Sequence, residues 1–201
     1  MDDQFLNRPV AASLYDAFRN EPFYLAIAGS RRDAAKSEKE VLLKYFDFCI
    51  REASKYGIFY TLEDPSLGAS LWLKPLNARL EKQKASEKEA FIEKYLGNES
   101  KIIYKKMAGL MAKMEINIIG KDDWYLSILA IATVHQKKGY GTQLLKPILA
   151  EADKQGVNTY LETFTESNLL FYGKLGYQVA LEYFEPTLRK TCWIMLRKGS
   201  S

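Results

Sequence analysis

The last third of the chain alternates strand, helix and strand, and this order limits the possible folds more than any other feature. Residues 124–131 are a run of large apolar side chains that predicts a strand. Residues 141–155 place leucines on one face of a helix, and residues 157–164 predict another strand. Two parallel strands joined by a helix within about 40 residues form a right-handed crossover unit. Residues 177–183 and 191–197 predict two further strands, which we expect to be antiparallel. The predicted class is therefore α+β with a mixed sheet.

The preceding two thirds of the sequence predict mostly helix, with one hairpin. Helical spacing of apolar residues predicts helices over residues 10–19 and 32–56. Residues 58–62 and 69–73 read as strands that a turn joins into a hairpin. Residues 77–117 return to helix with one break, and we interpret their methionine-rich face as packing rather than as a binding groove.

Length and composition narrow the function. A chain of 201 residues fits one domain, at about 150 residues per domain, and we expect residues 1–201 to form it. Two cysteines and one histidine, His135, exclude zinc sites built from four cysteines, from two cysteines and two histidines, or from three histidines. The net charge of +4 is compatible with an anionic ligand and too weak to indicate nucleic acid. The acidic start and the lack of a long apolar run predict a soluble cytoplasmic protein that needs no membrane.

The segment at residues 129–142 carries the strongest chemical signal. It runs from the apolar strand through a loop with Lys137, Lys138, Gly139 and Gly141 into the next helix. Glycine lets the backbone approach a ligand closely, and the first amides of a helix have no internal partner. With the helix dipole and the two lysines, they predict a site for a phosphate or pyrophosphate. A Walker loop does not match, and the dinucleotide fingerprint lacks its third glycine.

Two sequence blocks resemble the motifs of one enzyme family. The pattern Gln-x-x-Gly-x-Gly at Gln136, Gly139 and Gly141 resembles motif A of the GNAT superfamily, the acetyl-CoA-dependent N-acetyltransferases. Residues 168–177 resemble motif B of the same family, and the gap between the two blocks also fits. The resemblance implies an enzyme that moves an acetyl group from acetyl-CoA to a primary amine, by direct attack in a ternary complex.

The same resemblance implies a fold and a set of cofactor contacts. The sheet would be mixed and mostly antiparallel, with one splayed parallel strand pair and flanking helices. The domain would comprise N-terminal helices and a hairpin at residues 23–75, a helical insertion at 77–117 and a cofactor-binding half at 124–197. The splayed strand would bind the pantetheine arm through its main chain, and the pyrophosphate would lie over the loop. The contacts implied are Leu129, Ala130, Ile131, Gln136, Lys137, Lys138, Gly139, Tyr140, Gly141 and Thr142.

The resemblance also implies catalytic roles. Asn168 would hydrogen-bond the arm of the cofactor, and Tyr172 would protonate the departing thiolate. For the base that deprotonates the amine, Glu162 is the first candidate, while Asp122 and Asp123 are weaker ones. The alternative for Glu162 is a solvated strand carboxylate, and the alternative for Tyr172 is a plain core aromatic.

Two positions depart from the family pattern. Thr133 stands where many members have proline, and Lys137 stands where many have glycine. The loss of that glycine narrows the conformations open to the loop, but Gly139 and Gly141 remain and Lys137 can contact phosphate.

The acceptor is expected to be a small-molecule or peptide amine, and the sequence leaves its identity open. Phe23, Tyr24, Trp72 and the helices at residues 77–117 are the candidate walls of its cleft. A monomer and a homodimer are both compatible with the sequence, and no metal is expected. A second hypothesis is a non-catalytic module of the same fold that binds or senses acyl-CoA. A third, a nucleotide-dependent oxidoreductase, is disfavoured by the missing third glycine.

Overall fold

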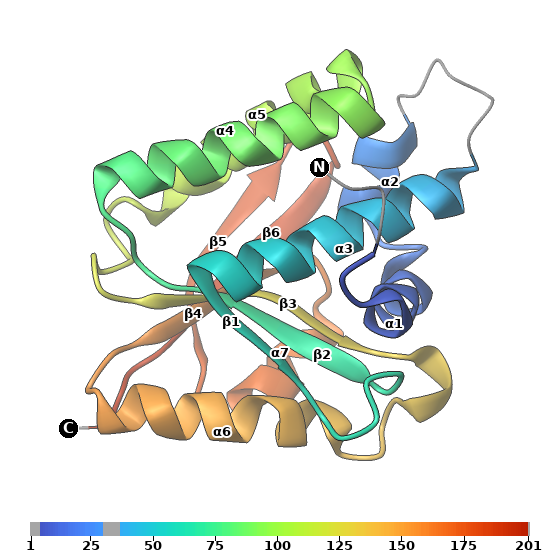
Figure 1. Ribbon diagram of the computed structural model, residues 1–201. Helices are drawn as coiled ribbons and strands as arrows, with labels where there is room; N and C mark the ends of the chain where they lie inside the picture. Colours follow the sequence, from blue (N-terminus) through green and yellow to red (C-terminus); the bar gives the residue numbers. More distant parts are fainter. Residues whose placement is uncertain (1–4, 30–36, 201) are drawn as a thin grey trace.

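The computed structural model describes residues 5–29 and 37–200 and folds them into one mixed sheet with helices on both faces (Figure 1). The first half contains α1 (Arg8–Phe18), α2 (Pro22–Gly29), α3 (Glu38–Tyr56), β1 (Gly57–Thr61), β2 (Gly68–Leu73), α4 (Ala78–Tyr95) and α5 (Asn98–Glu115). The second half contains β3 (Trp124–Ile131), the short 3₁₀ helix η1 (Thr133–His135), α6 (Tyr140–Lys154), β4 (Thr159–Thr163), α7 (Ser167–Gly173), β5 (Gln178–Glu185) and β6 (Lys190–Arg197). Within the described residues, no helix combines the length and the apolar character needed to cross a membrane.

The strands of the described residues form a six-stranded sheet in the order β1-β2-β3-β4-β6-β5. Neighbouring strands are antiparallel except for β3 and β4, which are parallel. That parallel pair is short, because only Trp124 with Thr159 and Tyr125 with Tyr160 lie in register before the strands diverge. The predicted mixed, mostly antiparallel sheet with one splayed parallel pair is confirmed.

A β-bulge determines toward which face of the sheet the side chains in each part of β3 point. The pairing of β3 with β2 skips Ser127, so that Trp72 lies opposite Leu126 while Leu71 lies opposite Ile128. An extra residue in one strand shifts the alternation of side chains between the two faces. Leu126 therefore packs with α6, whereas Ile128 packs with α1 and α3 on the other face.

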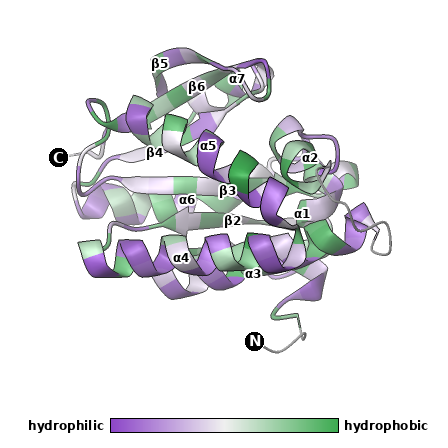
Figure 2. Ribbon diagram, turned by 90° about the horizontal axis from the view of Figure 1, so that it is seen from above, coloured by the Kyte–Doolittle hydropathy of each residue, from purple (hydrophilic) through white to green (hydrophobic). Residues whose placement is uncertain are grey.

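The two faces of the sheet carry separate hydrophobic cores. One core joins α1, α2, α3, α4 and α5 to the sheet and includes the fully buried Phe46 and Ile92. The other packs α6 and α7 against the opposite face around Trp72 and Leu145. Figure 2 shows α3 and α4 side by side, with α5 crossing above β3 and β4. The α4–α5 pair thus covers the place where the sheet splits.

The predicted elements are largely confirmed, and the differences are local. The strand predicted at residues 124–131 has the bounds of β3, and the predicted hairpin is the antiparallel pair of β1 and β2. The helix predicted from residue 32 begins at Glu38, because Ser37 and Glu40 form a capping box that satisfies the first amides. Residues 32–36 of that prediction lie outside the described residues.

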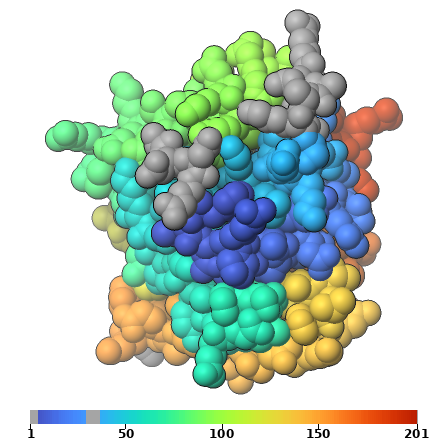
Figure 3. Space-filling model, turned by 45° about the vertical axis from the view of Figure 1, so that its right-hand side comes forward, coloured from blue at the N-terminus to red at the C-terminus, as the bar shows by residue number. Residues whose placement is uncertain are grey.

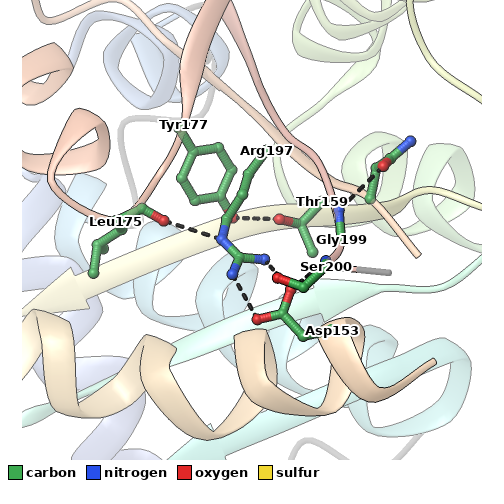
Figure 4. Close-up of polar contacts among 8 residues, drawn as sticks. Asp153, Thr159, Leu175, Tyr177, Arg197, Gly199 and Ser200 are labelled. Carbon is green, nitrogen blue, oxygen red and sulfur yellow. Dashed lines mark hydrogen bonds and ion pairs between the residues drawn. The ribbon is translucent and has the colours of Figure 1, made fainter. Parts of the chain in front are cut away.

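An arginine at the end of β6 ties three elements together (Figure 4). The Arg197 guanidinium donates hydrogen bonds of 2.8 and 2.6 Å to Asp153 in α6, and its Nε donates one of 3.0 Å to the backbone carbonyl of Leu175, after α7. Nearby, the Thr159 hydroxyl donates to the Tyr177 hydroxyl at 2.9 Å. The hydrogen bonds from Arg197 hold the pKa of Asp153 below its usual range.

We predict that Arg197→Met destabilises the fold by about 1.5–3 kcal/mol, the usual loss for hydrogen bonds that involve a charged group. The control Arg19→Met removes an exposed contact of 3.7 Å with Asp16 and should cost less than about 1 kcal/mol. Urea unfolding at neutral pH measures both losses. Because pairing lowers the folded-state pKa of Asp153, its stabilisation is present above the unfolded pKa of about 3.9 and is lost as the pH falls through the folded-state pKa. The loss in Arg197→Met should therefore shrink in acid, and a loss no larger than the control's would contradict this role.

Candidate active site

A cavity of about 580 Å³ opens where β3 and β4 diverge. Residues of both strands line it, and one face of α5 covers it with Tyr104, Met111 and Glu115 at helical spacing. Side chains from the predicted cofactor half and from the N-terminal helices line the same space. Two parts of the chain that are far apart in sequence therefore form one cavity.

The second half of β3 has one backbone edge facing the split. β2 pairs with the other edge of β3 as far as Ile131. Beyond Tyr125, none of the described strands pairs with the edge on the β4 side. Backbone groups on such an edge need hydrogen-bond partners, and an extended ligand can add to them as a strand does. Leu129 lines the cavity, and Ala130 and Ile131 continue the same edge.

The start of α6 has the backbone geometry of an anion site. Gly139 caps the helix in the left-handed region with φ of +83°, and Tyr140, Gly141 and Thr142 form its first turn. The amides of a first turn have no intrahelical partner, and they point at the helix N-terminus. A Cβ on Gly141 would lie 3.1 Å from the Phe171 ring, so glycine at this position lets α7 approach α6 closely.

The rest of the loop explains one departure from the family pattern. Lys137 has φ of +62°, a conformation that glycine adopts more easily, at the position where many family members have glycine. Lys137 and Lys138 are exposed beside the helix start, where they can contact an anion. The Gln136 side chain points back and donates to the carbonyl of Ile131 at 3.1 Å, so it fixes the loop onto the end of β3.

The other departure fixes α1 to the same loop. The Thr133 amide donates to the Asp16 carboxylate at 2.6 Å, and its hydroxyl donates to the Asp16 carbonyl at 3.2 Å. The amide hydrogen bond is the main reason why the pKa of Asp16 is lowered. Proline at this position has no N–H and cannot make that contact. Figure 3 shows the result, with the dark blue α1 seated against the gold segment that leads into α6.

The two residues of the second motif both line the cavity. Asn168 donates through its side-chain amide to the Thr163 hydroxyl at 3.1 Å, which fixes it beside the end of β4. Tyr172 is buried and packs edge-on against Tyr177, with ring centroids 5.7 Å apart. Burial raises the pKa of Tyr172, so its hydroxyl keeps its proton at neutral pH. Tyr172 is thus a core aromatic that also faces the cavity and carries an available proton.

Glu162 of β4 lines the cavity as a partly buried carboxylate. The hydroxyls of Tyr183 and Tyr125 donate to its two oxygens at 3.3 and 3.4 Å. Burial is the main reason why its pKa rises to about 8, and the nearby charge of Glu115 adds to the rise. Near neutral pH this carboxylate can both take up and release a proton.

Glu115 is a cavity residue that the sequence reasoning missed. It is the last residue of α5 and lies near the hydroxyl of Tyr160, which lowers the pKa of Glu115, and the ring of Tyr160 stacks on Tyr125 at 4.9 Å between centroids. Burial raises the pKa of Glu115 to about 7. The signal that could have identified it is its spacing of four and eight residues from Met111 and Met107, which places all three on one helix face.

The remaining candidates divide into cavity residues and structural ones. Phe23 and Tyr24 line the cavity, whereas the prediction that Trp72 does so is wrong. Trp72 is fully buried in the core with α6, on the face of β2 that points away from the cavity. Asp123 borders the cavity, but its carboxylate accepts two hydrogen bonds that hold the loop before β3. Asp122 is exposed outside it.

Comparison with known families identifies the class of the protein as acyltransferase, through a match over residues 44–177. The matching family is described as the Acetyltransferase (GNAT) family, and the chain belongs to it. An uncharacterized N-acetyltransferase of Schizosaccharomyces pombe is 23% identical over 198 residues, which cover 95% of this chain and 79% of that protein.

Solved structures share the fold over nearly the whole chain. A structure described as histone acetyltransferase HPA2 and related acetyltransferase, from Corynebacterium glutamicum, has a TM-score of 0.65 at 18% identity and covers 96% of this chain and 90% of its own. Arylalkylamine N-acetyltransferase 2 from Aedes aegypti has a TM-score of 0.61 at 15% identity and covers 97% of each chain. At these identities the likeness shows a common fold.

We predict that the pKa of Glu162 shifts in opposite directions in two variants. Glu115→Gln removes a like charge and should lower this pKa from about 8, whereas Tyr183→Phe removes a donor to the ionised carboxylate and should raise it. Titration of carbon-13-labelled glutamate carboxyl groups by NMR measures the shifts. Glu93→Gln, at an exposed carboxylate paired with Lys101, is the control and should leave the pKa unchanged. Shifts of the same sign would contradict the arrangement.

Proposed function

We propose that the protein is an N-acetyltransferase that transfers the acetyl group of acetyl-CoA to a primary amine by direct attack in a ternary complex. The observation that carries this proposal is the cavity itself, because Asn168, Tyr172 and Glu162 all line the same space at the split of the sheet. A proton donor and a proton acceptor thus share one cavity beside the free edge of β3.

The residues around the split fit acetyl-CoA as the donor substrate. The free edge of β3 from Leu129 to Ile131 would bind the extended arm through main-chain hydrogen bonds. The first amides of α6, together with Lys137 and Lys138, would bind the pyrophosphate. Asn168 would hydrogen-bond the arm close to the thioester. Donors gathered at a helix N-terminus with positive charge nearby suit a phosphate ligand.

The two titratable side chains suit the two proton transfers of the reaction. Glu162 would take a proton from the acceptor ammonium, and the freed amine nitrogen would form a bond with the acetyl carbon as the carbon–sulfur bond breaks. Tyr172 would donate its proton to the leaving sulfur, and the second proton that the amide nitrogen loses would restore the Tyr172 hydroxyl. A base with a pKa of about 8 is matched to work near neutral pH, and a buried tyrosine holds its proton until the thiolate forms.

The proposed acceptor is a primary amine on a small molecule or a peptide. The structural neighbour from Aedes aegypti is named for arylalkylamine substrates, and its fold matches along the whole chain. The buried carboxylates and tyrosines of the cavity support an amine, because they favour a cation over an anion.

We predict that acetyl-CoA raises the melting temperature of the protein, that NAD does not, and that Gly141→Val weakens acetyl-CoA binding. A valine at this position meets the Phe171 ring, and overpacking of about 1–3 kcal/mol would displace the amides of the loop. Calorimetry should then show binding weaker by about tenfold or more. Gly109→Val, at a glycine with open space around it, is the control. Stabilisation by NAD alone would refute the proposal.

We predict that Tyr172→Phe lowers kcat by about 10²–10⁴-fold with little change in the KM for acetyl-CoA, because it removes the general acid. Turnover of the wild type, followed by release of the CoA thiol, should rise with pH through about 8 as Glu162 loses its proton. Tyr172→Phe should keep this rise, and Glu162→Gln should abolish it. Tyr60→Phe, outside the cavity, is the control. If the protein binds acetyl-CoA but no amine causes release of the CoA thiol, the protein would instead be a sensing module.

A further inference from the structure

We propose that the acceptor carries a second cationic group besides the amine that is acetylated, and that Glu115 binds this second cation. The inference rests on the proposed function and specifies its substrate class: a linear aliphatic amine with a positive charge at its other end. It follows from how two carboxylates and two tyrosine rings are arranged at the split of the sheet.

The two carboxylates lie beside one aromatic pair. Tyr125 and Tyr160 are neighbours in the last register pair before β3 and β4 diverge, and their rings stack at 4.9 Å. Tyr125 donates a hydrogen bond to Glu162, and the hydroxyl of Tyr160 acts on Glu115 and lowers the pKa of that carboxyl. Each carboxylate therefore lies next to a different ring of the stack, and both line the same cavity. The arrangement provides two separate carboxylates, one on β4 and one on α5.

Neither carboxylate has a basic partner among the residues that the structure describes. In the described part of the chain, no lysine or arginine lies within 4.0 Å of Glu115 or Glu162, although four lysines line the cavity. Those lysines contact other groups: Lys84 pairs with Glu81, Lys88 pairs with Glu52, Lys121 lies 4.0 Å from Asp122, and Lys74 lies over the Trp124 ring. Burial without a counterion is costly for a carboxylate and raises its pKa, so a bound cation at each position would relieve that cost.

The surroundings of Glu115 favour a cation independently of its own charge. Glu115 ends the 18-residue helix α5, and the C-terminal end of a helix dipole attracts positive charge within its last turn. The rings of Tyr160 and Tyr125 provide aromatic faces, which also attract cations. The other carboxylates that line the cavity already have partners within the chain: Glu52 and Glu81 pair with lysines, Asp123 holds its own loop, and Glu21 accepts a hydrogen bond from the backbone amide of Phe23. Because Glu162 is assigned to the amine that reacts, we assign the second charge on the same molecule to Glu115.

The cavity also contains a lysine, which raises the opposite possibility of an acceptor with an anionic tail. Lys88 is buried and pairs with Glu52 at 2.6 Å, under the rings of Tyr45 and Tyr104. The charge of Lys88 is already balanced by Glu52, so an anionic tail would have to displace a buried partner. Glu115 has no such partner, and this difference selects the cationic tail.

The test uses amines that differ only in the charge of the distant end. The set is 1,4-diaminobutane, butylamine and 4-aminobutanoate, each accompanied by its three-carbon and five-carbon homologues so that chain length does not decide the outcome. The expected order of kcat/KM is diamine, then monoamine, then amino acid. The diamine should lead by about tenfold or more, well beyond the statistical advantage of two equivalent amines.

Two variants assign the preference to Glu115. Glu115→Gln should bring the ratio of diamine to monoamine close to one, and this ratio cancels any change in Glu162 because the reacting amine is the same. Glu81→Gln, at a cavity carboxylate already paired with Lys84, should keep the wild-type ratio. A wild-type ratio near one, a ratio that Glu115→Gln leaves unchanged, or the amino acid as the best acceptor would each overturn the inference.

A binding measurement separates this inference from the proposed function. If no amine causes release of the CoA thiol, the proposed transfer reaction fails, and calorimetry of the same amines on the protein saturated with CoA still tests the cation site. Tighter binding of the diamine that is lost in Glu115→Gln would support the site without catalysis. Equal binding of diamine and monoamine would overturn it.

Discussion

The structure depends on the early divergence of β3 and β4, which pair over only two residues of each strand. Each strand keeps its other neighbour, because β2 pairs with β3 from Tyr125 to Ile131 around the bulge and β6 pairs with every residue of β4. The sheet therefore stays continuous while a gap opens inside it. Backbone groups along the gap lose their strand partners, and unpaired backbone is costly when buried. The fold is thus arranged around a gap in the sheet, and we propose that an extended ligand completes the sheet there.

The helices close this gap differently on its two faces. On one face α6 and α7 pack around Trp72, and the glycine-rich start of α6 lies at the end of β3. On the other face α5 covers the gap and brings Glu115 above Tyr160. The bulge at Ser127 lets a single strand supply apolar side chains to both layers. The sides that we propose for the cofactor and for the acceptor are therefore built from different layers, and both line one cavity.

Local signals in the sequence were sufficient for the elements and for the loop, but not for the walls of the cavity. The apolar run of β3 and the glycines before α6 depend on residues close together in the chain, so the sequence alone predicts both features. The prediction that Trp72 lines the cavity is wrong because the alternation of side chains in β2 indicates two faces but does not indicate which face borders the cavity. Glu115 was missed because its role depends on Tyr160, a residue far along the chain that only the folded sheet brings beneath α5.

The buried carboxylates also show why stability and binding are linked in this cavity. If apolar side chains filled the space between β3 and β4, they would be buried without an electrostatic cost. The chain instead places Glu115 and Glu162 there, and neither has a basic partner among the described residues. Raised pKa values let both groups carry protons near neutral pH, which reduces the cost in the free protein. A bound cationic ligand would stabilise the ionised carboxylates, which would then release those protons. Glu115 and Glu162 can thus be neutral or charged near neutral pH. The acceptor would provide the positive charges that balance them.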